Sequence, residues 1–172
     1  MTRIVSGKWG GRRLAVPTGS PVRPTAERVR EAWLSILGPE LNDARLVDLF
    51  AGTGALGLEG LSRGAASCDF VEQHSRTRNV LNANVAALDA AGQSRVIGAD
   101  VHRFVVGLER GSYDIALADP PFTGDDAERL VAAWRDRPFA RILAVEHHPR
   151  CPLAGSGTRR WGDIAVTFFR EE

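Results

Sequence analysis

Short apolar runs in this chain alternate with segments in which apolar residues recur every three or four positions. Five runs are centred on residues 46–50, 68–72, 95–97, 113–117 and 142–146. Runs of this length, bounded by glycine or polar residues, are typical of buried strands. Between the second and third runs, the spacing of Leu81, Val85 and Leu88 favours a helix. Strands that alternate with helices predict an α/β fold with a mostly parallel sheet covered on both faces.

The two ends of the chain depart from this rhythm. β-prone residues at 4–5 and 14–16 flank a glycine-rich reversal, so we expect a β-hairpin there. A proline-rich connector follows, and Thr25 is the expected N-cap of the first helix. At the other end, residues 164–169 predict a last strand, which a hairpin partner within 151–161 would make antiparallel. We therefore divide the chain into an arm with its connector, residues 1–22, and a main domain, residues 23–172.

Composition and length narrow the class of protein. The 172 residues are 44% hydrophobic and 25% charged, which is typical of one soluble globular domain. No apolar run approaches the roughly 18 residues of a membrane span, and the first residues lack the apolar stretch of a signal peptide. Two cysteines do not make a disulfide framework, so we expect a cytoplasmic protein. We expect no metal site, because the pair His147-His148 has no third ligand at a suitable spacing.

The charge of the chain is unevenly distributed. The net charge of +1 and the pI of about 7.9 argue against nucleic-acid binding, for which a domain pI above about 9 is usual. However, residues 1–30 hold seven basic residues and one acidic residue (net +6), whereas residues 31–172 hold 15 basic and 20 acidic residues (net −5). Such asymmetry is a sign of a basic segment that meets nucleic acid or a membrane surface. The candidates for contacts with such a partner, which the family resemblance described below makes RNA, are Arg3, Lys8, Trp9, Arg12, Arg13, Arg23, Arg28 and Arg30.

A glycine-rich turn follows the first predicted strand of the main domain. The segment 48–57 contains G-x-G-x-x-G, with Gly52 and Gly54 as its first two glycines. Glycine lets the backbone turn sharply and lets a ligand approach where a Cβ would collide. Glu72 lies 20 residues after Gly52, the spacing of an acid that binds a ribose. The pattern fits two ligands, a dinucleotide and S-adenosylmethionine.

Acidic residues at the strand ends favour the second ligand. Asp48 lies at the end of the first strand, where its carboxylate would repel a pyrophosphate and suit an ammonium and a sulfonium group. Glu72 and Asp100 follow the next two strands, and Asp100 is placed to reach an adenine. Ligands in open α/β sheets bind beyond the carboxyl ends of the strands, so we expect these three acids to line one cleft.

The tetrad Asp119-Pro120-Pro121-Phe122 follows the fourth strand directly. Two prolines fix φ and remove two backbone donors, and the residue before a proline is held extended. The Pro120 carbonyl and the Asp119 carboxylate therefore offer two neighbouring acceptors, and Phe122 offers a flat aromatic face. Two acceptors beside an aromatic ring suit the exocyclic amine of a nucleobase, so we expect Asp119, Pro120 and Phe122 to be the catalytic residues.

The tetrad resembles the [DNS]-P-P-[YFW] motif of amino-group methyltransferases that use S-adenosylmethionine. The segments 7–14, 23–25, 28–32 and 48–64 resemble the bacterial 16S rRNA guanine-N2 methyltransferases of the RsmD type, and the likeness covers residues 1 to about 146. It implies a Rossmann-like methyltransferase fold, with a mostly parallel seven-stranded sheet, an antiparallel last strand and an N-terminal β-hairpin extension. Residues 23–172 would then be the methyltransferase domain, and the arm would bind RNA.

The resemblance also implies an activity. The reaction would be S-adenosylmethionine-dependent methylation of the N2 amine of one guanine in 16S rRNA, conventionally position 966. Thr25 becomes a candidate cofactor ligand, because related enzymes place this segment near the methionine end of the cofactor. Asp48, Gly52, Gly54, Glu72 and Asp100 are the other expected cofactor-binding residues. We expect a monomer that acts on 16S rRNA within an assembled or assembling small subunit.

Three alternatives stay open. The chain could be another amino-methyltransferase, acting on a different RNA or on DNA adenine, although no separate DNA-recognition domain is evident. It could be a nicotinamide-dependent oxidoreductase, against which Asp48 and the Asp-Pro-Pro-Phe tetrad argue. It could also be a non-catalytic ribosome-assembly factor, although the intact tetrad and glycine turn argue against loss of catalysis.

Overall fold

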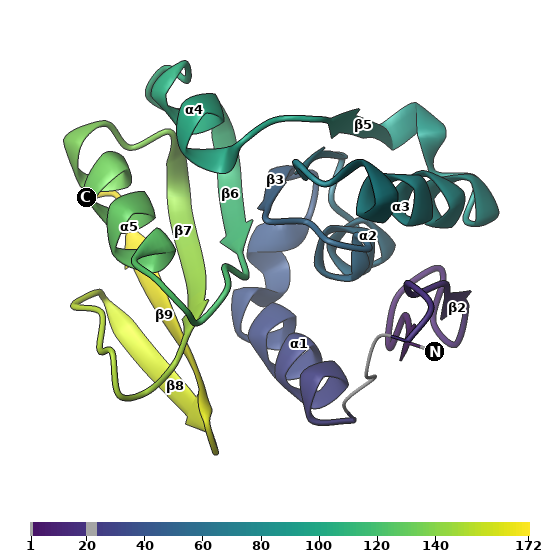
Figure 1. Cartoon of the computed structure of the whole chain (residues 1–172), viewed down its shortest axis with the longest axis horizontal. Coiled ribbons are helices and arrows are strands. Elements are labelled where there is room, and N and C mark those ends of the chain that lie inside the picture. The colour runs from purple at the N-terminus through teal and green to yellow at the C-terminus, as the bar shows by residue number, and fades with distance from the viewer. Residues whose placement is uncertain (1, 20–23) are drawn as a thin grey trace.

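A seven-stranded sheet forms the centre of the computed structural model, which describes residues 2–19 and 24–172 (Figure 1). The strand order is β5-β4-β3-β6-β7-β9-β8. Strands β3 to β7 pair in parallel, and β9 is antiparallel to both β7 and β8, as the sequence predicts for the last strand. The strands are β3 (Arg45–Leu49), β4 (Ser67–Val71), β5 (Ser94–Ile97), β6 (Tyr113–Ala118), β7 (Ala140–His147), β8 (Gly157–Trp161) and β9 (Ile164–Arg170).

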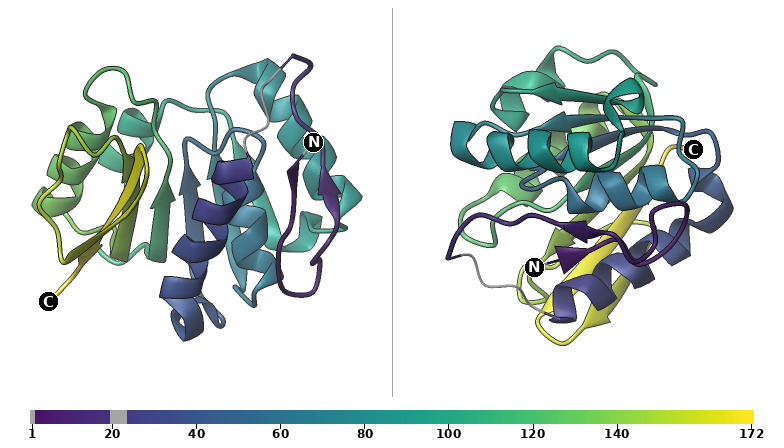
Figure 2. Two further views of the ribbon diagram at one scale, coloured as in Figure 1. Left: turned by 90° about the horizontal axis from the view of Figure 1, so that it is seen from below. Right: turned by 90° about the vertical axis from the view of Figure 1, so that its right-hand side faces the viewer.

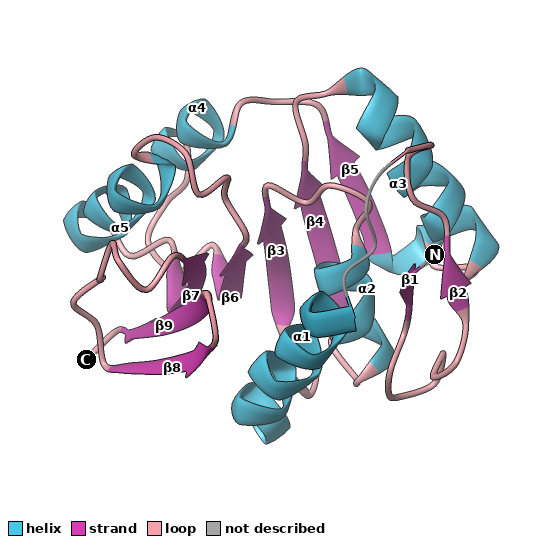
Figure 3. Cartoon of the chain, turned by 60° about the horizontal axis from the view of Figure 1, so that its bottom comes forward, coloured by secondary structure: helices cyan, strands magenta, loops and turns pink. Residues whose placement is uncertain are grey.

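Helices cover both faces of this sheet. One buried apolar cluster joins the sheet to α1, α2 and α3, and a second cluster joins its other face to α4 and α5. Figure 3 shows α1 crossing in front of the strands. The helices are α1 (Pro24–Leu37), α2 (Ala55–Ser62), α3 (Ser75–Ala87), α4 (Val101–Val106) and α5 (Asp126–Asp136), with short 3-10 turns at Gly38–Leu41 and Ala91–Gln93. In the described ranges, no helix is long and apolar enough to cross a bilayer.

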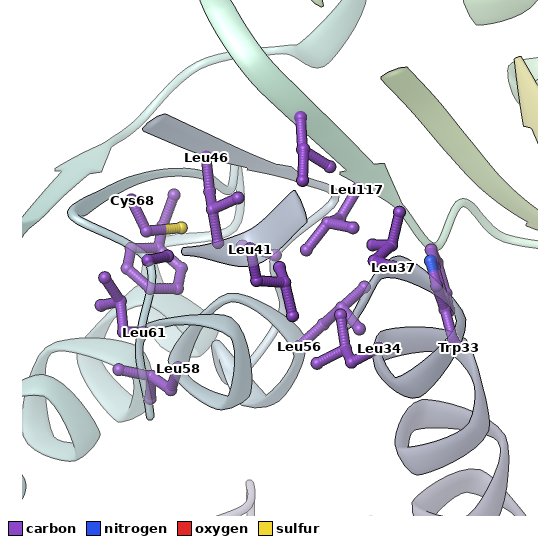
Figure 4. Packing of buried hydrophobic residues seen from close by; sticks show 14 of the residues in the cluster. Trp33, Leu34, Leu37, Leu41, Leu46, Leu56, Leu58, Leu61, Cys68 and Leu117 are labelled. Atoms are coloured by element: carbon purple, nitrogen blue, oxygen red, sulfur yellow. The ribbon is translucent and has the colours of Figure 1, made fainter. Parts of the chain in front are cut away.

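The alternation of side chains along β3 explains both clusters. Leu46 belongs to the cluster under α1 and α2, and Val47 belongs to the cluster on the opposite face. Figure 4 shows Leu46 and Leu117 of the sheet beside Leu34 of α1 and Leu56 of α2. Full burial of one such side chain stabilises the fold by roughly 1.5–3 kcal/mol. The cluster that contains Leu46 therefore holds α1 and α2 next to the carboxyl end of β3.

The N-terminal hairpin packs on the same face as α1 (Figure 2). Its strands are β1 (Thr2–Arg3) and β2 (Arg13–Leu14), and Ile4 and Leu14 are completely buried in the cluster under α1, α2 and α3. The hairpin thus contributes side chains to the core, whereas the division of the chain at residue 22 stays a prediction.

Two local predictions near this end are wrong. We expected strands at residues 4–5 and 14–16, but β1 and β2 are shorter and begin earlier in the chain. The reason is that two backbone N–H groups in the expected strands donate to side chains and not to the neighbouring strand. Val5 N–H donates to Glu59, and Ala15 N–H donates to Asn84. The first helix begins at Pro24, so Thr25 lies inside its first turn and is not the N-cap. Proline suits this position because the first helical N–H has no intrahelical acceptor.

Candidate active site

Acidic residues meet at the carboxyl edge of the sheet. The register pairs Leu49 with Ala118 and Ala118 with Val145, so the residues that follow each of them lie side by side. Asp119 is therefore level with Phe50 on one side and with Glu146 on the other. The order of strands reverses at β3 and β6, the switch point at which open α/β sheets bind ligands.

Asp48 and the glycine turn form a tightly packed unit. The Oδ2 atom of Asp48 accepts the Gly57 N–H at 2.9 Å, and the side chain is 1% exposed. Burial, the largest effect, raises the pKa of Asp48 well above its usual value, and the Gly57 N–H opposes this shift. Gly54 has a φ of +84°, and a Cβ on it would lie 2.3 Å from Leu81 Cδ1, so alanine would strain the backbone and displace the Leu81 side chain.

Gly52 has a different role. Its φ is +58°, and a Cβ built there meets no atom within 4 Å. Glycine is favoured at this position by the backbone conformation and by the open space beside it. Both features allow a ligand to approach the backbone closely. The sequence prediction treated the glycines of the turn alike, whereas the structure separates a packing glycine from a glycine that faces a cavity.

Glu72 and Asp100 hold the loops that follow β4 and β5. Glu72 Oε2 accepts the Gly52 N–H at 2.9 Å, and its Oε1 accepts the His74 N–H at 3.1 Å. Asp100 is the N-cap of α4 and accepts the Arg103 N–H at 3.0 Å. Each carboxylate oxygen has a second lone pair, so both residues can still accept a hydrogen bond from a ligand.

Two cavities lie at this edge and share Phe50 and Asp119 among their lining residues. The first has a volume of about 300 Å³ and is lined also by Asp48, Gly52 and Glu146. The second, of about 410 Å³, is lined by Glu72, Asp100, Pro120 and Pro121 among others. Phe50 has a φ of +59°, which is uncommon for a bulky residue and directs the chain between the two spaces.

The charge of the two cavities is strongly one-sided. Among the lining residues that belong to the described part of the chain, Arg30 is the single Lys or Arg side chain. The acids are Asp48, Glu72, Asp100, Asp119, Asp126 and Glu146. A lining of this charge attracts a cationic ligand and repels a pyrophosphate. Within the part of the chain that the structure describes, no group of three or more potential metal ligands is brought together.

Asp119, Pro120 and Pro121 of the tetrad after β6 line the second cavity, and Phe122 lines a smaller pocket together with the two prolines. Among the described residues, no backbone or side-chain group donates a hydrogen bond to the Pro120 carbonyl oxygen. Phe122 is 42% exposed, and its ring makes an edge contact with His148, with 5.9 Å between the ring centres. The exposed face of Phe122 is therefore free to receive another planar group.

Glu146 was not among the predicted site residues. It lies in β7 and lines the first cavity together with Asp119. Burial, and then the neighbouring Asp119, raise the pKa of Glu146 to about 8. Burial among surrounding atoms also raises the pKa of Asp119 to about 6, although the cavities leave its side chain open to water. Glu146 follows an apolar run directly, as Asp48 and Asp119 do. This position is the sequence signal by which Glu146 could have been predicted.

The predicted RNA contacts lie on two neighbouring elements. Arg3, Arg13 and Arg28 are exposed on the hairpin and on α1. Lys8 donates to Gln93 Oε1 at 2.9 Å, and its ammonium lies 4.4 Å from the centre of the Trp9 ring.

Arg12 and Arg23 are two further predicted contacts with RNA. Arg12 donates to the Ala87 carbonyl at 2.7 Å and remains exposed. Arg23 lies outside the described residues, as does the side chain of Thr25.

Arg30 differs from the other arginines. Its side chain is 9% exposed, its Nε lies 3.6 Å from Glu59 Oε2, and it donates to the Arg3 carbonyl. This guanidinium joins α1, α2 and the hairpin, so Arg30 does not offer the exposed phosphate contact that the sequence predicts. Arg30 also lines the first cavity, together with Trp33.

Comparisons with known proteins show the family to which the chain belongs. A family model described as Conserved hypothetical protein 95 matches residues 2–144. Ribosomal RNA small subunit methyltransferase D of Escherichia coli K12 is 42% identical over 135 residues, 78% of this chain and 67% of that protein. Its counterpart in Haemophilus influenzae is 34% identical over 156 residues, 88% and 81% of the two chains.

A solved structure extends the likeness to nearly the whole fold. The yhhF protein of Escherichia coli superimposes with a TM-score of 0.86 and 32% identity, covering 99% of this chain and 98% of that one. The chain therefore belongs to the Conserved hypothetical protein 95 family, in which ribosomal RNA small subunit methyltransferase D is also found.

Proposed function

We propose that this protein transfers a methyl group from S-adenosylmethionine to the N2 amine of one guanine in 16S rRNA, the guanine conventionally numbered 966. The observation that carries the proposal is the position of Asp119 and Pro120. Two acceptors lie together at the edge of a cavity, beside an exposed aromatic ring. Membership of the family supports methyl transfer to ribosomal RNA, and the acceptor pair supports an amine as the target.

The residues present fit S-adenosylmethionine. This cofactor carries an ammonium and a sulfonium group, and the acids of the two cavities supply the opposite charge. Asp48 would hold the ammonium end, Glu72 the ribose hydroxyls and Asp100 the adenine, with Gly52 leaving room for close approach. When bound, the cofactor supplies a methyl group on a positively charged sulfur.

Asp119 and Pro120 prepare the amine. The N2 lone pair of guanine is delocalised into the ring, which makes the amine a poor nucleophile. If Asp119 and the Pro120 carbonyl each accept one N2–H, the amine is drawn toward tetrahedral geometry and its lone pair is directed at the methyl group. After transfer, the cationic amine loses one proton to the Asp119 carboxylate or to water. Positioning of this kind supplies a large part of the acceleration.

Phe122 and the basic residues would hold the RNA. The exposed ring of Phe122 can stack on a guanine that has left its helix or loop, at a cost of a few kcal/mol for unstacking. The exposed arginines of the hairpin and α1 would bind phosphates as planar forks. We propose that the protein acts as a monomer in the cytoplasm, on an assembled or assembling small subunit.

The decisive experiment is methyl transfer with isotopically labelled S-adenosylmethionine to small subunits and to naked 16S rRNA, both from a strain that lacks this enzyme. We expect label in N2-methylguanosine at position 966, identified by nuclease mapping and mass spectrometry. Label in N6-methyladenosine, or at another guanine, would replace the proposed target. Stabilisation by NADH and not by S-adenosylmethionine in a melting experiment would refute the cofactor.

A further inference from the structure

Glu146 lies next to the proposed acceptor of the amine and has no role in the mechanism above. It comes from β7, one strand away from Asp119, and lines the first cavity with it. The paired register of Ala118 and Val145 places Asp119 and Glu146 side by side on neighbouring strands, and both line the first cavity. Two carboxyl groups can share a hydrogen bond only if one of them keeps its proton.

The surroundings decide which of the two keeps the proton. The ionisable groups that line the first cavity with Glu146 are Asp48, Asp119 and Arg30. Glu146 also lines a smaller pocket, whose other ionisable groups are Glu128, His147, His148 and Cys151. The facing position on β9 is the apolar Val166. Burial and Asp119 raise the pKa of Glu146 to about 8, above the value of about 6 for Asp119. Asp119 is exposed to water and Glu146 is half-buried, so the negative charge of the pair is better solvated on Asp119 and the proton is better placed on Glu146.

We propose that Glu146 is a positioning residue that works in its protonated form, donating a hydrogen bond to Asp119 and thereby fixing the oxygen that accepts the target amine. The inference rests on the proposed function, because it requires Asp119 to receive the amine. A fixed carboxylate needs no reorganisation when the amine arrives, which is the advantage of a preorganised acceptor. Glu146 itself touches neither the reacting nitrogen nor the methyl group in this role.

A different role for Glu146 predicts the opposite effect of the substitution Glu146→Gln. An ionised Glu146 could accept the N1–H of guanine directly and so read the base. Glutamine is nearly the same shape as glutamic acid, remains neutral and can donate from its amide, so Glu146→Gln preserves the positioning role. It would weaken the direct reading of N1–H, because the charge of the acceptor is removed.

The first test compares Glu146→Gln with Glu146→Ala in methyl transfer to the RNA substrate, with kcat/KM measured as a function of pH. We expect Glu146→Ala to lose about 100-fold and Glu146→Gln to restore most of that loss. The wild-type profile should fall on the acid side as Asp119 is protonated and on the alkaline side as Glu146 ionises. The alkaline fall should be absent in Glu146→Gln. Equal losses in both variants, or an unchanged alkaline limb, would overturn the proposal.

The second test needs neither RNA nor cofactor. The infrared difference spectrum of wild type minus Glu146→Gln at neutral pH should contain the carbonyl band of one protonated carboxylic acid, because a protonated Asp48 contributes to both proteins and cancels. The difference spectrum of wild type minus Glu128→Gln, a matched change at an exposed position of the small pocket beside Glu146, should contain no such band. Absence of the band from the first difference spectrum would refute a protonated Glu146. A band assigned to Glu146 in a protein that methylates no guanine would instead refute the proposed function and leave the protonation state standing.

Discussion

Glu59 accepts the backbone N–H of Val5 with both of its carboxylate oxygens, at 3.1 and 2.9 Å. Glu59 lies in α2 and is completely buried, and it also accepts the Ser6 N–H at 2.9 Å. Arg30 and Arg63 lie 3.6 and 3.3 Å from its oxygens. A buried charge therefore connects the hairpin to the helix that begins at the glycine turn.

Removing this charge should destabilise the whole fold. We expect Glu59→Gln to lower the free energy of unfolding by roughly 3–5 kcal/mol, because two buried guanidinium groups lose their counter-charge. Urea unfolding followed by circular dichroism measures the change. Glu109→Gln, at an exposed position, is the control and should unfold like the wild type. A shift below about 1 kcal/mol for Glu59→Gln would show that the hairpin is held mainly by its apolar side chains.

Gly52 and Gly11 form a matched pair for testing the cofactor site. Both have positive φ, +58° and +85°, and a Cβ on either meets nothing within 4 Å. Alanine at each position should cost about 1–2 kcal/mol of stability through backbone strain. Only Gly52→Ala should also weaken binding of S-adenosylmethionine, measured by calorimetry, because its methyl group enters the first cavity. Equal affinities in the two variants would remove Gly52 from the site.

Asp119→Ala should separate catalysis from cofactor binding. We expect methyl transfer to fall about 100-fold or more, because the amine loses its charged acceptor. The calorimetric Kd for S-adenosylmethionine should change little. Comparable losses in rate and in cofactor affinity would assign Asp119 to the cofactor or to folding instead.

The contribution of the basic residues can be measured through salt dependence. Deleting residues 1–17 is unsuitable, since Ile4 and Leu14 belong to the core. We expect Arg13→Gln and Arg28→Gln each to weaken RNA binding and to lower the slope of log K against log salt by about 0.7 to 0.9. Arg129→Gln, exposed on α5, should leave both unchanged. An unchanged slope in the first two variants would exclude these arginines from the RNA contact.

Stability should depend on pH through Glu146. Its pKa is raised from 4.5 to about 8 in the folded protein, so the folded state binds more protons than the unfolded state between these values. The free energy of unfolding therefore falls as pH rises through this window. In Glu146→Gln, this fall should be smaller by an amount of the order of 1–3 kcal/mol, reduced by partial exposure of the side chain. Urea unfolding at pH 5 and pH 8.5 measures the difference, and equal falls in the two proteins would show that Glu146 ionises normally.

Local patterns in the sequence determined much of the molecule. The apolar runs located the strands of the parallel sheet, because a strand buried on both faces must be apolar along its length. The turn at Gly52 and the tetrad at Asp119 were recognisable because consecutive residues determine their backbone conformation. The acids Asp48, Glu72 and Asp100 followed from their positions at the ends of those runs.

Tertiary structure alone decided how distant groups are paired. Glu146 meets Asp119 only through the register of β6 and β7, and Glu59 meets Val5 only because the hairpin packs on α2. Arg30 looks like the other arginines in the sequence, yet the core around it turns it into a buried counter-ion. Periodicity and turn chemistry act between near neighbours in the chain. The protonation of a carboxyl group and the burial of a charge depend instead on atoms brought from elsewhere, because desolvation and Coulomb interactions act through space.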